Sequence, residues 1–322
     1  MSGRNEGKTI LITGGGGFLG ARLAELILAK DPKAAILLTD IDRSPRVDAL
    51  AGRVEFIRAD ISDPGICRDL VGPHTGTVYH LASLVSGGAE KDFEAGLRAN
   101  LFATIHLLEA CRLRAEKPVF VFTSSIATFG GRNLPDEVDD YTYQHPQNSY
   151  GAAKVAGEQL LNDYSRKGFL DGRGVRLPAI IVRDVANTAL SGYASNMIRE
   201  PLAGKDYLCP VGEEMRIPLM GIATATRLLH ALGTMDGALL GDYRSLNGRG
   251  ISPSAGEIAA AVAACAPPER PLGSIAFRRD PEVERVVAAW PRVMHGKRAE
   301  ALGLPGDRGI EAVIREYLAG LG

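Results

Sequence analysis

The chain has 322 residues, of which 45% are hydrophobic and 23% charged, an ordinary balance for a globular protein with a large core. Its 37 basic and 38 acidic side chains are intermixed and give a formal net charge of -1. No long basic run is present to neutralise phosphates, so we expect no nucleic acid partner.

Three further features narrow the class of protein. The four cysteines are widely spaced and fit neither a metal-ligand pattern nor a disulfide framework, and the six histidines form no zinc-protease motif, so we expect no metal. The polar start of the chain is followed by an apolar stretch that breaks at four glycines. Because this pattern fits neither a signal peptide nor a membrane span, we expect a cytoplasmic protein without a membrane partner.

Short apolar runs alternate with amphipathic stretches through the first half of the chain. Apolar strands that alternate with helices predict a parallel sheet covered on both faces, which is a Rossmann-type, doubly wound α/β fold. The predicted strands are residues 9–13, 35–39, 54–58, 77–81, 119–123 and 175–182, and the predicted helices are 18–30, 92–114 and 150–167.

A glycine-rich loop joins the first predicted strand to the first predicted helix. Gly14, Gly17 and Gly20 have the spacing G-x-x-G-x-x-G. The first permits a tight turn, the second lets backbone amides approach a pyrophosphate, and the third allows close packing of helix and strand. In this strand–turn–helix context the loop predicts a dinucleotide site, with Phe18 and Leu19 at the start of the helix.

Asp40 ends the second predicted strand, 20 residues after Gly20. A carboxylate there accepts hydrogen bonds from ribose hydroxyls and repels a 2′-phosphate, which favours NAD over NADP. Arg43 would suit a 2′-phosphate, although an exposed surface position is the favoured interpretation. Asp60 and Ile61, after the third predicted strand, are placed to reach the adenine; alternatively, Asp60 is a carboxylate at a helix N-terminus.

Residues 1–182 are therefore expected to form an NAD-binding domain. Beyond residue 183 the alternating pattern loosens, with helical segments at about 222–232, 254–265 and 308–318. We expect 183–322 to be mainly a smaller C-terminal substrate-binding lobe, with residues at about 219–250 returning to the Rossmann core.

Tyr150 and Lys154 lie four residues apart and so share one face of the predicted helix. A free tyrosine titrates near ~10, and a cation one turn away lowers that value by stabilising the phenolate. Hydroxyl groups at residues 123–125 end the fifth predicted strand, at the sheet edge where open α/β folds bind ligands. These side chains predict an active site at that edge.

Together with His80-Leu-Ala-Ser83 and Asn100, these motifs resemble the extended short-chain dehydrogenase/reductases, the NAD-dependent epimerase/dehydratase family. The resemblance implies that Ser125 orients a substrate hydroxyl, that Tyr150 takes its proton, and that hydride passes to the nicotinamide. Family members commonly dimerise through the helices at 92–114 and 150–167, so we expect a homodimer. The resemblance also implies NAD contacts from Leu81, Ala82, Ser83, Asn100, Tyr150, Lys154, Pro178 and Ile180.

Two details bear on the reaction. A dehydratase of this family would carry Thr-Asp-Glu around the catalytic serine, where this chain has Ser125-Ile-Ala127, so dehydration is disfavoured. Nucleotide-sugar epimerases often have an asparagine where this chain has Ala179. A nucleotide-sugar 4-epimerase with tightly bound NAD is therefore weakened but stays open as the alternative.

Longer segments resemble the D-erythronate dehydrogenase group, which oxidises a four-carbon sugar acid to its 2-oxo form. The resemblance implies a small hydroxy-acid substrate, but departures at 184–187 and 221–222 leave the identity of that acid open. The segments that carry the resemblance are 80–93, 162–168, 171–178, 198–204 and 289–291.

A substrate carboxylate would be bound best by a guanidinium or by backbone amides. Arg183, after the sixth predicted strand, is the first candidate; the alternative is a surface or ion-paired arginine. Ser83, Ser86 and Gly87 follow the fourth predicted strand and offer donors to substrate oxygens; the alternative there is a flexible loop. The predicted substrate set is completed by Ser125, Tyr150 and Asn187.

Overall fold

The computed structural model describes residues 7–182 and 192–320, which fall into two compact units. The first comprises the chain up to Thr128, Asn148–Arg176 and Thr226–Leu246; the second comprises Phe129–Gln147, Leu177–Ala225 and the chain from Asn247. The predicted division differs in three respects. The second stretch of the first unit ends at Arg176 instead of residue 182, the stretch that returns to it is 226–246 instead of about 219–250, and 129–147 lies in the second unit.

A seven-stranded sheet in the order β11-β7-β5-β4-β1-β2-β3 forms the centre of the first unit. β1 pairs in parallel with β2 and β4, β2 with β3, and β4 with β5. The strand order reverses between β1 and β4: β2 and β3 follow on one side of β1, and β4 and β5 lie on the other. Doubly wound sheets bind ligands at the carboxyl ends of the strands beside such a reversal. The strands are β1 (Thr9–Thr13), β2 (Ala35–Asp40), β3 (Glu55–Arg58), β4 (Thr75–His80), β5 (Val119–Ser125), β7 (Asp171–Leu177) and β11 (Ser245–Asn247).

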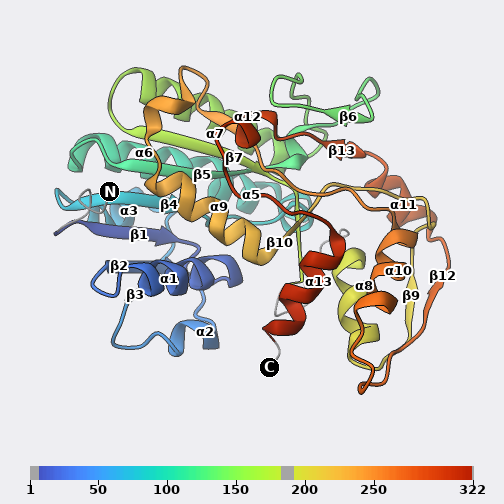
Figure 1. Ribbon diagram of the computed structural model, residues 1–322. Coiled ribbons are helices and arrows are strands. Elements are labelled where there is room, and N and C mark those ends of the chain that lie inside the picture. The colour runs from blue at the N-terminus through green and yellow to red at the C-terminus, as the bar shows by residue number, and fades with distance from the viewer. Residues whose placement is uncertain (1–6, 183–191, 321–322) are drawn as a thin grey trace. The chain divides into compact units, whose positions relative to one another are not determined.

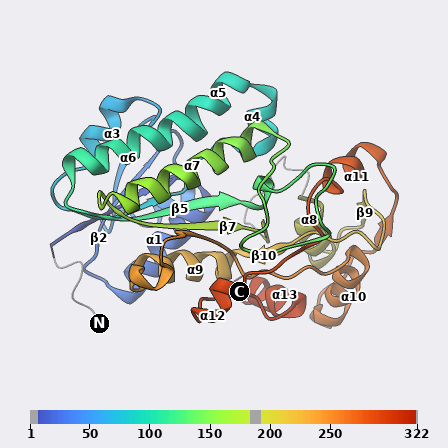
Figure 2. The same ribbon diagram turned by 90° about the horizontal axis from the view of Figure 1, so that it is seen from above.

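Helices cover both faces of this sheet, as a Rossmann-type fold requires (Figures 1 and 2). One face carries α3, α6 and α7, where fully buried Leu11, Val78 and Phe120 pack against Cys67 and Leu107. The other face carries α1 and α9. The predicted fold class is therefore confirmed. The helices are α1 (Phe18–Lys30), α2 (Pro45–Asp48), α3 (Pro64–Leu70), α6 (Ala103–Arg114), α7 (Ser149–Arg166) and α9 (Ile222–Thr234).

The region after β4 is more divided than the single helix predicted for 92–114. It runs through α4 (Ser86–Lys91), α5 (Phe93–Leu97), the π-helical η1 (Arg98–Phe102) and then α6. Asp92 separates α4 from α5, because its backbone is extended at φ -130° and its side chain caps α5 by accepting from Ala95 N. Ser86 and Gly87 thus begin a helix, and the flexible-loop alternative for them is wrong.

The predicted strand at 175–182 is two strands of different sheets. β7 ends at Leu177, and after Pro178 the chain enters β8 (Ala179–Ile181), which pairs in parallel with β10 (Leu219–Gly221) in the second unit. A proline has no N–H to donate to a strand ladder. The apolar run therefore continues through the proline while the hydrogen-bonding partner changes.

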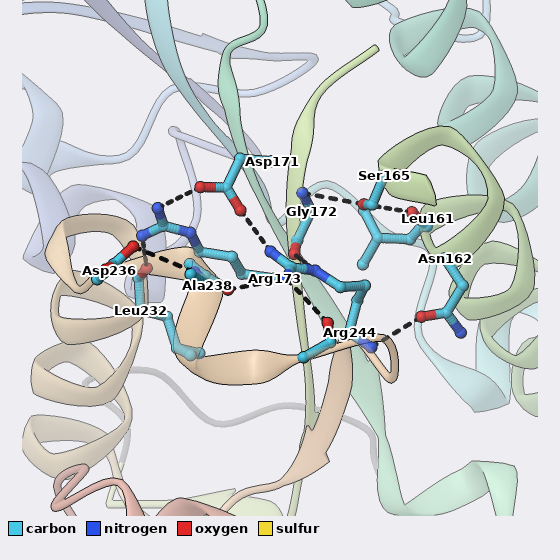
Figure 3. Close-up of polar contacts among 12 residues, drawn as sticks. Leu161, Asn162, Ser165, Asp171, Gly172, Arg173, Leu232, Asp236, Ala238 and Arg244 are labelled. Atoms are coloured by element: carbon cyan, nitrogen blue, oxygen red, sulfur yellow. Dashed lines mark hydrogen bonds and ion pairs between the residues drawn. The ribbon is translucent and has the colours of Figure 1, made fainter. Parts of the chain in front are cut away.

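Residues 226–246 are bound to β7 by two arginines that share one carboxylate (Figure 3). Arg173 Nη2 lies 2.7 Å from Asp171 Oδ2 and Nη1 donates to the carbonyl of Leu232, while Arg244 Nη2 pairs with Asp171 Oδ1. Arg244 also donates from Nε to the carbonyl of Gly172 at 2.8 Å. Within the first unit, these contacts attach η3 (Gly237–Leu240) and β11 to the edge of the sheet.

The second unit has its own apolar core, in which Met197, Ile258 and Ile314 are fully buried. Its two other strand pairs are β12 with β9 and β13 with β6. The predicted helices at 254–265 and 308–318 match α10 and α13 to within two residues at each end. The remaining elements here are β6 (Glu137–Val138), α8 (Gly192–Leu202), β9 (Tyr207–Cys209), α10 (Ala255–Cys265), β12 (Ile275–Phe277), α11 (Pro281–Val287), β13 (Val293–Met294), α12 (Lys297–Ala301) and α13 (Ile310–Ala319).

Candidate active site

The glycine loop between β1 and α1 is close-packed. Gly14 has φ +69°, and a Cβ there would lie 2.6 Å from the backbone nitrogen of Ala82, while a Cβ at Gly20 would collide with the carbonyl of Gly14. Gly17 is the N-cap of α1, and because glycine has no side chain, no side chain caps the first turn of the helix. A helix N-terminus approached only by backbone suits a pyrophosphate, so these residues fit the dinucleotide of NAD.

Asp40, the last residue of β2, is oriented by backbone donors from two loops. Its Oδ2 accepts from Gly16 N at 3.0 Å and its Oδ1 from Ile41 N at 2.8 Å. Burial raises the pKa of this carboxyl and the backbone donors lower it, with a net upward direction. Arg43 is paired with Asp48 at 2.6 Å and its side chain is 42% exposed. Arg43 is therefore an exposed, ion-paired residue, which agrees with the favoured interpretation.

Asp60 and Ile61 follow β3, as expected. Asp60 is exposed and its Oδ1 accepts from Ser62 N at 2.9 Å, while Ile61 is buried. The N-cap of α3 is Asp63, which accepts from Gly65 N, so the helix-cap alternative for Asp60 is wrong. Contact of Asp60 and Ile61 with the adenine stays a prediction.

His80 ends β4 opposite Thr13 of β1, and both of its ring nitrogens are hydrogen-bonded. Thr104 Oγ1 donates to the carbonyl of Asn100, so it accepts from His80 Nε2 at 3.0 Å. His80 Nδ1 then accepts from Thr13 Oγ1 at 2.8 Å. Burial, with a smaller effect of Lys154, lowers the pKa of His80 to about 3, so this histidine is a neutral structural residue.

Asn100 holds the loop that follows β4. Its Oδ1 accepts from Ser83 Oγ and from Leu84 N, each at 2.9 Å, and its Nδ2 donates to the carbonyl of Leu84. Leu81 N donates to the carbonyl of Thr13. The structure brings Leu81 and Ala82 against Gly14 of the glycine loop, and Ser83 follows them in the segment held by Asn100. Because Asn100 lies in η1, the wider π-helical turn sets its position, and such turns are frequent at functional sites.

The predicted catalytic side chains come from two packed elements of the first unit. Ser125 is the last residue of β5, and its Oγ accepts from Ala127 N at 3.1 Å. Tyr150 lies in the first turn of α7, whose N-cap Asn148 accepts from Gly151 N at 2.7 Å. α7 packs closely on β5, because a Cβ at Gly157 would lie 2.6 Å from the ring of Phe122.

Lys154 is buried one turn after Tyr150. Its Nζ lies 5.5 Å from the centre of the Tyr150 ring and 5.0 Å from that of Phe122. Burial lowers the pKa of this ammonium to about 7, against an upward effect of Glu158. A cation in this position stabilises a phenolate at Tyr150, which is the property a tyrosine base needs.

Behind Lys154 lies a buried ion pair that the sequence analysis missed. Arg176 of β7 donates from Nη2 to Glu158 Oε2 at 2.6 Å, and both side chains are fully buried. Ser124 Oγ donates to Glu158 Oε1, and Arg176 Nη2 donates to Tyr243 Oη. The sequence offered one signal for this ion pair, a glutamate four residues after Lys154. The pairing of that glutamate with Arg176 joins α7 to β7 and could not be read from the sequence.

Four predicted residues fall outside this arrangement. Pro178 and Ile180 are buried residues of the second unit, and their contact with NAD stays a prediction. Arg183 and Asn187 lie outside the described residues. Within 7–182 and 192–320, no group of three or more His, Cys, Asp or Glu side chains could hold a metal ion, and no helix is long and apolar enough to cross a membrane.

This combination of fold, glycine loop and Tyr-x-x-x-Lys helix defines a class of enzyme. Residues 10–227 match the NAD dependent epimerase/dehydratase family, and the chain belongs to that family. The predictions of an NAD cofactor and of an oxidoreductase of the extended short-chain dehydrogenase/reductase type are thereby confirmed.

Two curated relatives and one solved structure are similar over nearly the whole chain. D-erythronate dehydrogenase from Cupriavidus necator is 41% identical over 97% of this chain and 98% of the relative. D-erythronate dehydrogenase from Haemophilus influenzae is 36% identical over 96% of this chain and 98% of the relative. A nucleoside-diphosphate-sugar epimerase from Agrobacterium tumefaciens superimposes with a TM-score of 0.90 at 34% identity, covering 99% of this chain and 97% of that one.

Proposed function

We propose that this enzyme oxidises the 2-hydroxyl of a small sugar acid, such as D-erythronate, to the 2-oxo acid. The observation that carries the proposal is the buried Lys154 one turn from Tyr150, on the helix that packs against β5. The similarity to two D-erythronate dehydrogenases over almost their full length supports the choice of substrate class.

The proposed chemistry divides among three side chains. Ser125 donates a hydrogen bond that orients the substrate hydroxyl, and Tyr150, as the phenolate, takes its proton. Lys154 stabilises that phenolate and holds the nicotinamide ribose. Bound NAD⁺ supplies the acceptor for the hydride that leaves the same carbon. What the chain contributes is therefore position and charge.

We propose that NAD is bound mainly by residues that follow strands β1 to β4 of the first unit. The first turn of α1, at Phe18 and Leu19, receives the pyrophosphate, and Asp40 accepts from the adenosine ribose hydroxyls. Asp60 and Ile61 lie toward the adenine. Leu81, Ala82, Ser83, Asn100, Pro178 and Ile180 complete the proposed cofactor set.

For the substrate carboxylate we propose Arg183, with further polar contacts from Asn187. Ser86 and Gly87 belong to the proposed substrate set through their place in the first turn of α4, and Ser83 through its hydroxyl. A guanidinium suits a carboxylate because it can form two parallel hydrogen bonds. Replacement of Arg183 by Met should raise the KM for the acid and leave the affinity for NAD unchanged.

We also propose that the enzyme is a cytoplasmic homodimer. Apolar side chains remain exposed on the segment proposed to pair: Phe93 is 61% and Leu113 59% exposed. A dimer that covers them would remove this apolar surface from water. Light scattering after gel filtration should give twice the mass of the monomer for the wild type. It should give the mass of one monomer for Phe93→Glu.

The decisive experiment is a screen for NADH formation with D-erythronate, other aldonates, uronic acids and UDP-sugars. We expect stoichiometric NADH with one small sugar acid and none with UDP-sugars. Tyr150→Phe should lose nearly all turnover while keeping its melting temperature. Unchanged turnover in Tyr150→Phe would refute the proposed base.

The similarity to a nucleoside-diphosphate-sugar epimerase keeps one other activity testable. A 4-epimerase recycles its bound NAD, so it converts one UDP-sugar into another without net NADH. Product analysis of the UDP-sugar arm of the screen separates the two activities, because only the dehydrogenase accumulates NADH.

A further inference from the structure

The buried cluster of Ser124, Glu158 and Arg176 joins the three elements that surround the proposed catalytic lysine. Ser124 precedes Ser125 at the end of β5, Glu158 follows Lys154 by one turn of α7, and Arg176 comes from β7. Both carboxylate oxygens of Glu158 are used: Oε1 accepts from Ser124 Oγ and from Arg176 Nε at 3.1 Å, and Oε2 accepts from Arg176 Nη2 at 2.6 Å.

Burial makes the cluster electrostatically strong. Glu158 and Arg176 are 0% exposed and Lys154 is 1% exposed, so water screens these charges much less than charges at the surface. The three side chains carry two positive charges and one negative charge. The single carboxylate of Glu158 is therefore paired with Arg176 while it also attracts Lys154, and the net charge near Lys154 depends on both partners.

The other groups that face Lys154 cannot replace this carboxylate. A phenolate at Tyr150 compensates Lys154 only in the reactive state proposed above, and His80 of β4 is neutral because burial lowers its pKa to about 3. Tyr243, from the returning segment, accepts from Arg176. Burial lowers the pKa of Arg176, but the charge and hydrogen bonds of Glu158, with those of Tyr243, raise it more, so Arg176 stays a cation.

We propose that Glu158 is a positioning residue that keeps Lys154 protonated beside Tyr150, and that the positive charge of Arg176 on the same carboxylate opposes this effect. The inference rests on the proposed function, because it assigns Lys154 and Tyr150 their catalytic roles. It adds a second group that sets the pH at which the tyrosine can act as base. Ser124 contributes by fixing the carboxylate to the strand that ends at Ser125.

The two members of the ion pair have opposite predicted effects. Glu158→Gln removes the negative charge one helical turn from Lys154 and should lower the pKa of that ammonium by about 1–3 units, the range for a nearby opposite charge. Arg176→Gln removes the competing cation and should raise it. Both variants lose a buried pair and should melt at lower temperature, so stability alone does not distinguish the roles.

The direct measurement is an NMR titration of lysine labelled with carbon-13 at Cε, in the full chain without substrate. Lys154→Met identifies the signal. Asp163→Asn is the matched control, because it removes a carboxylate from the exposed side of the same helix, where Asp163 is 53% exposed. It should leave the Lys154 signal unchanged.

The kinetic counterpart is the acid limb of kcat/KM for the oxidised acid. It should move to higher pH in Glu158→Gln and to lower pH in Arg176→Gln, and Arg176→Lys should restore the wild-type position. Equal or same-direction shifts of the Lys154 pKa in the two Gln variants would overturn the inference. If Glu158→Gln does not fold, Arg176→Gln carries the test alone, and an unmoved pKa there overturns it.

Failure of the proposed function can be distinguished from failure of this inference. An enzyme that produces no NADH from any acid leaves the NMR titration readable, so the coupling of Lys154 to Glu158 is measured independently of turnover.

Discussion

Replacement of Gly14 by alanine tests whether the glycine loop is shaped by backbone contact or only by a permitted dihedral angle. Gly14 has φ +69°, and its Cβ would lie 2.6 Å from Ala82 N and 2.8 Å from Leu81 C, both backbone atoms. Gly52 is a matched control, because it has φ +77° and nothing within 4 Å of its Cβ position. The two variants share the strained dihedral angle and differ in the collision.

The two contributions have separate magnitudes. A left-handed conformation costs an L-residue about 1–2 kcal/mol, which applies to both variants. Insertion of a methyl group against atoms that cannot rotate away adds about 1–3 kcal/mol for Gly14→Ala. We therefore expect unfolding free energies to fall by about 1–2 kcal/mol for Gly52→Ala and about 2–5 kcal/mol for Gly14→Ala.

Urea unfolding gives the stabilities, and calorimetric titration with NAD gives the affinities. Gly14→Ala should also bind NAD at least about tenfold more weakly, the equivalent of one charge-assisted hydrogen bond to the pyrophosphate. Gly52→Ala should bind NAD normally. Equal losses of stability in the two variants, with unchanged NAD affinity, would show that the loop yields to the methyl group and would refute the reasoning.

Three other variants test separate parts of the fold. Asp40→Ser should reduce the preference for NAD over NADP by about tenfold or more, as kcat/KM for the two cofactors will report, since a charged hydrogen bond contributes about 1.5–3 kcal/mol. Asp171→Asn should lower the unfolding free energy by about 3 kcal/mol, because Arg173 is fully buried, while the exposed Asp163→Asn should lower it by less than about 1 kcal/mol. Lys154 has a pKa lowered to about 7, so the folded state binds fewer protons than the unfolded chain between that pH and the ordinary lysine value. The unfolding free energy of the wild type therefore rises with pH across that interval. Lys154→Met should be more stable than the wild type, with a difference that is largest at pH 7 and shrinks toward pH 10. A difference that does not change with pH would contradict the lowered pKa of Lys154.

The parts of the site that were predictable depend on local chain geometry. The helical repeat alone puts Tyr150 and Lys154 on one face, and the glycine spacing fixes the turn before Phe18. Likewise Asp40 follows from the end of an apolar strand, and it lies there in the structure.

The parts that were missed depend on pairing between distant segments. Arg176 and Tyr243 are 67 residues apart, and Asp171 and Arg244 are 73 apart. No periodic pattern in a single sequence links such positions. Pro178 shows the complementary failure, because the apolar run continues through it while the strand changes sheets.

The region of α4 shows another reason why part of the structure could not be predicted from the sequence. Ser86 and Gly87 have the composition of a loop, yet they start a helix because Val85 is extended and the following residues pack beside α5 and α7. Tertiary contact overrides local propensity there.

The contacts of Asp171 with Arg173 and Arg244 also have a consequence for folding during synthesis, because they join β7 to a segment that is made much later. During synthesis β7 emerges well before β11, and the chain between them builds α8 and β10 of the other unit. Until residue 232 is made Arg173 lacks the carbonyl of Leu232, and until β11 is made the sheet ends at β7 with an open strand edge, which is a site for pairing with other chains. A ribosome-bound chain therefore carries both units unfinished at once. For the same reason a cut between residues 177 and 225 divides both units, and neither can be obtained as one continuous fragment.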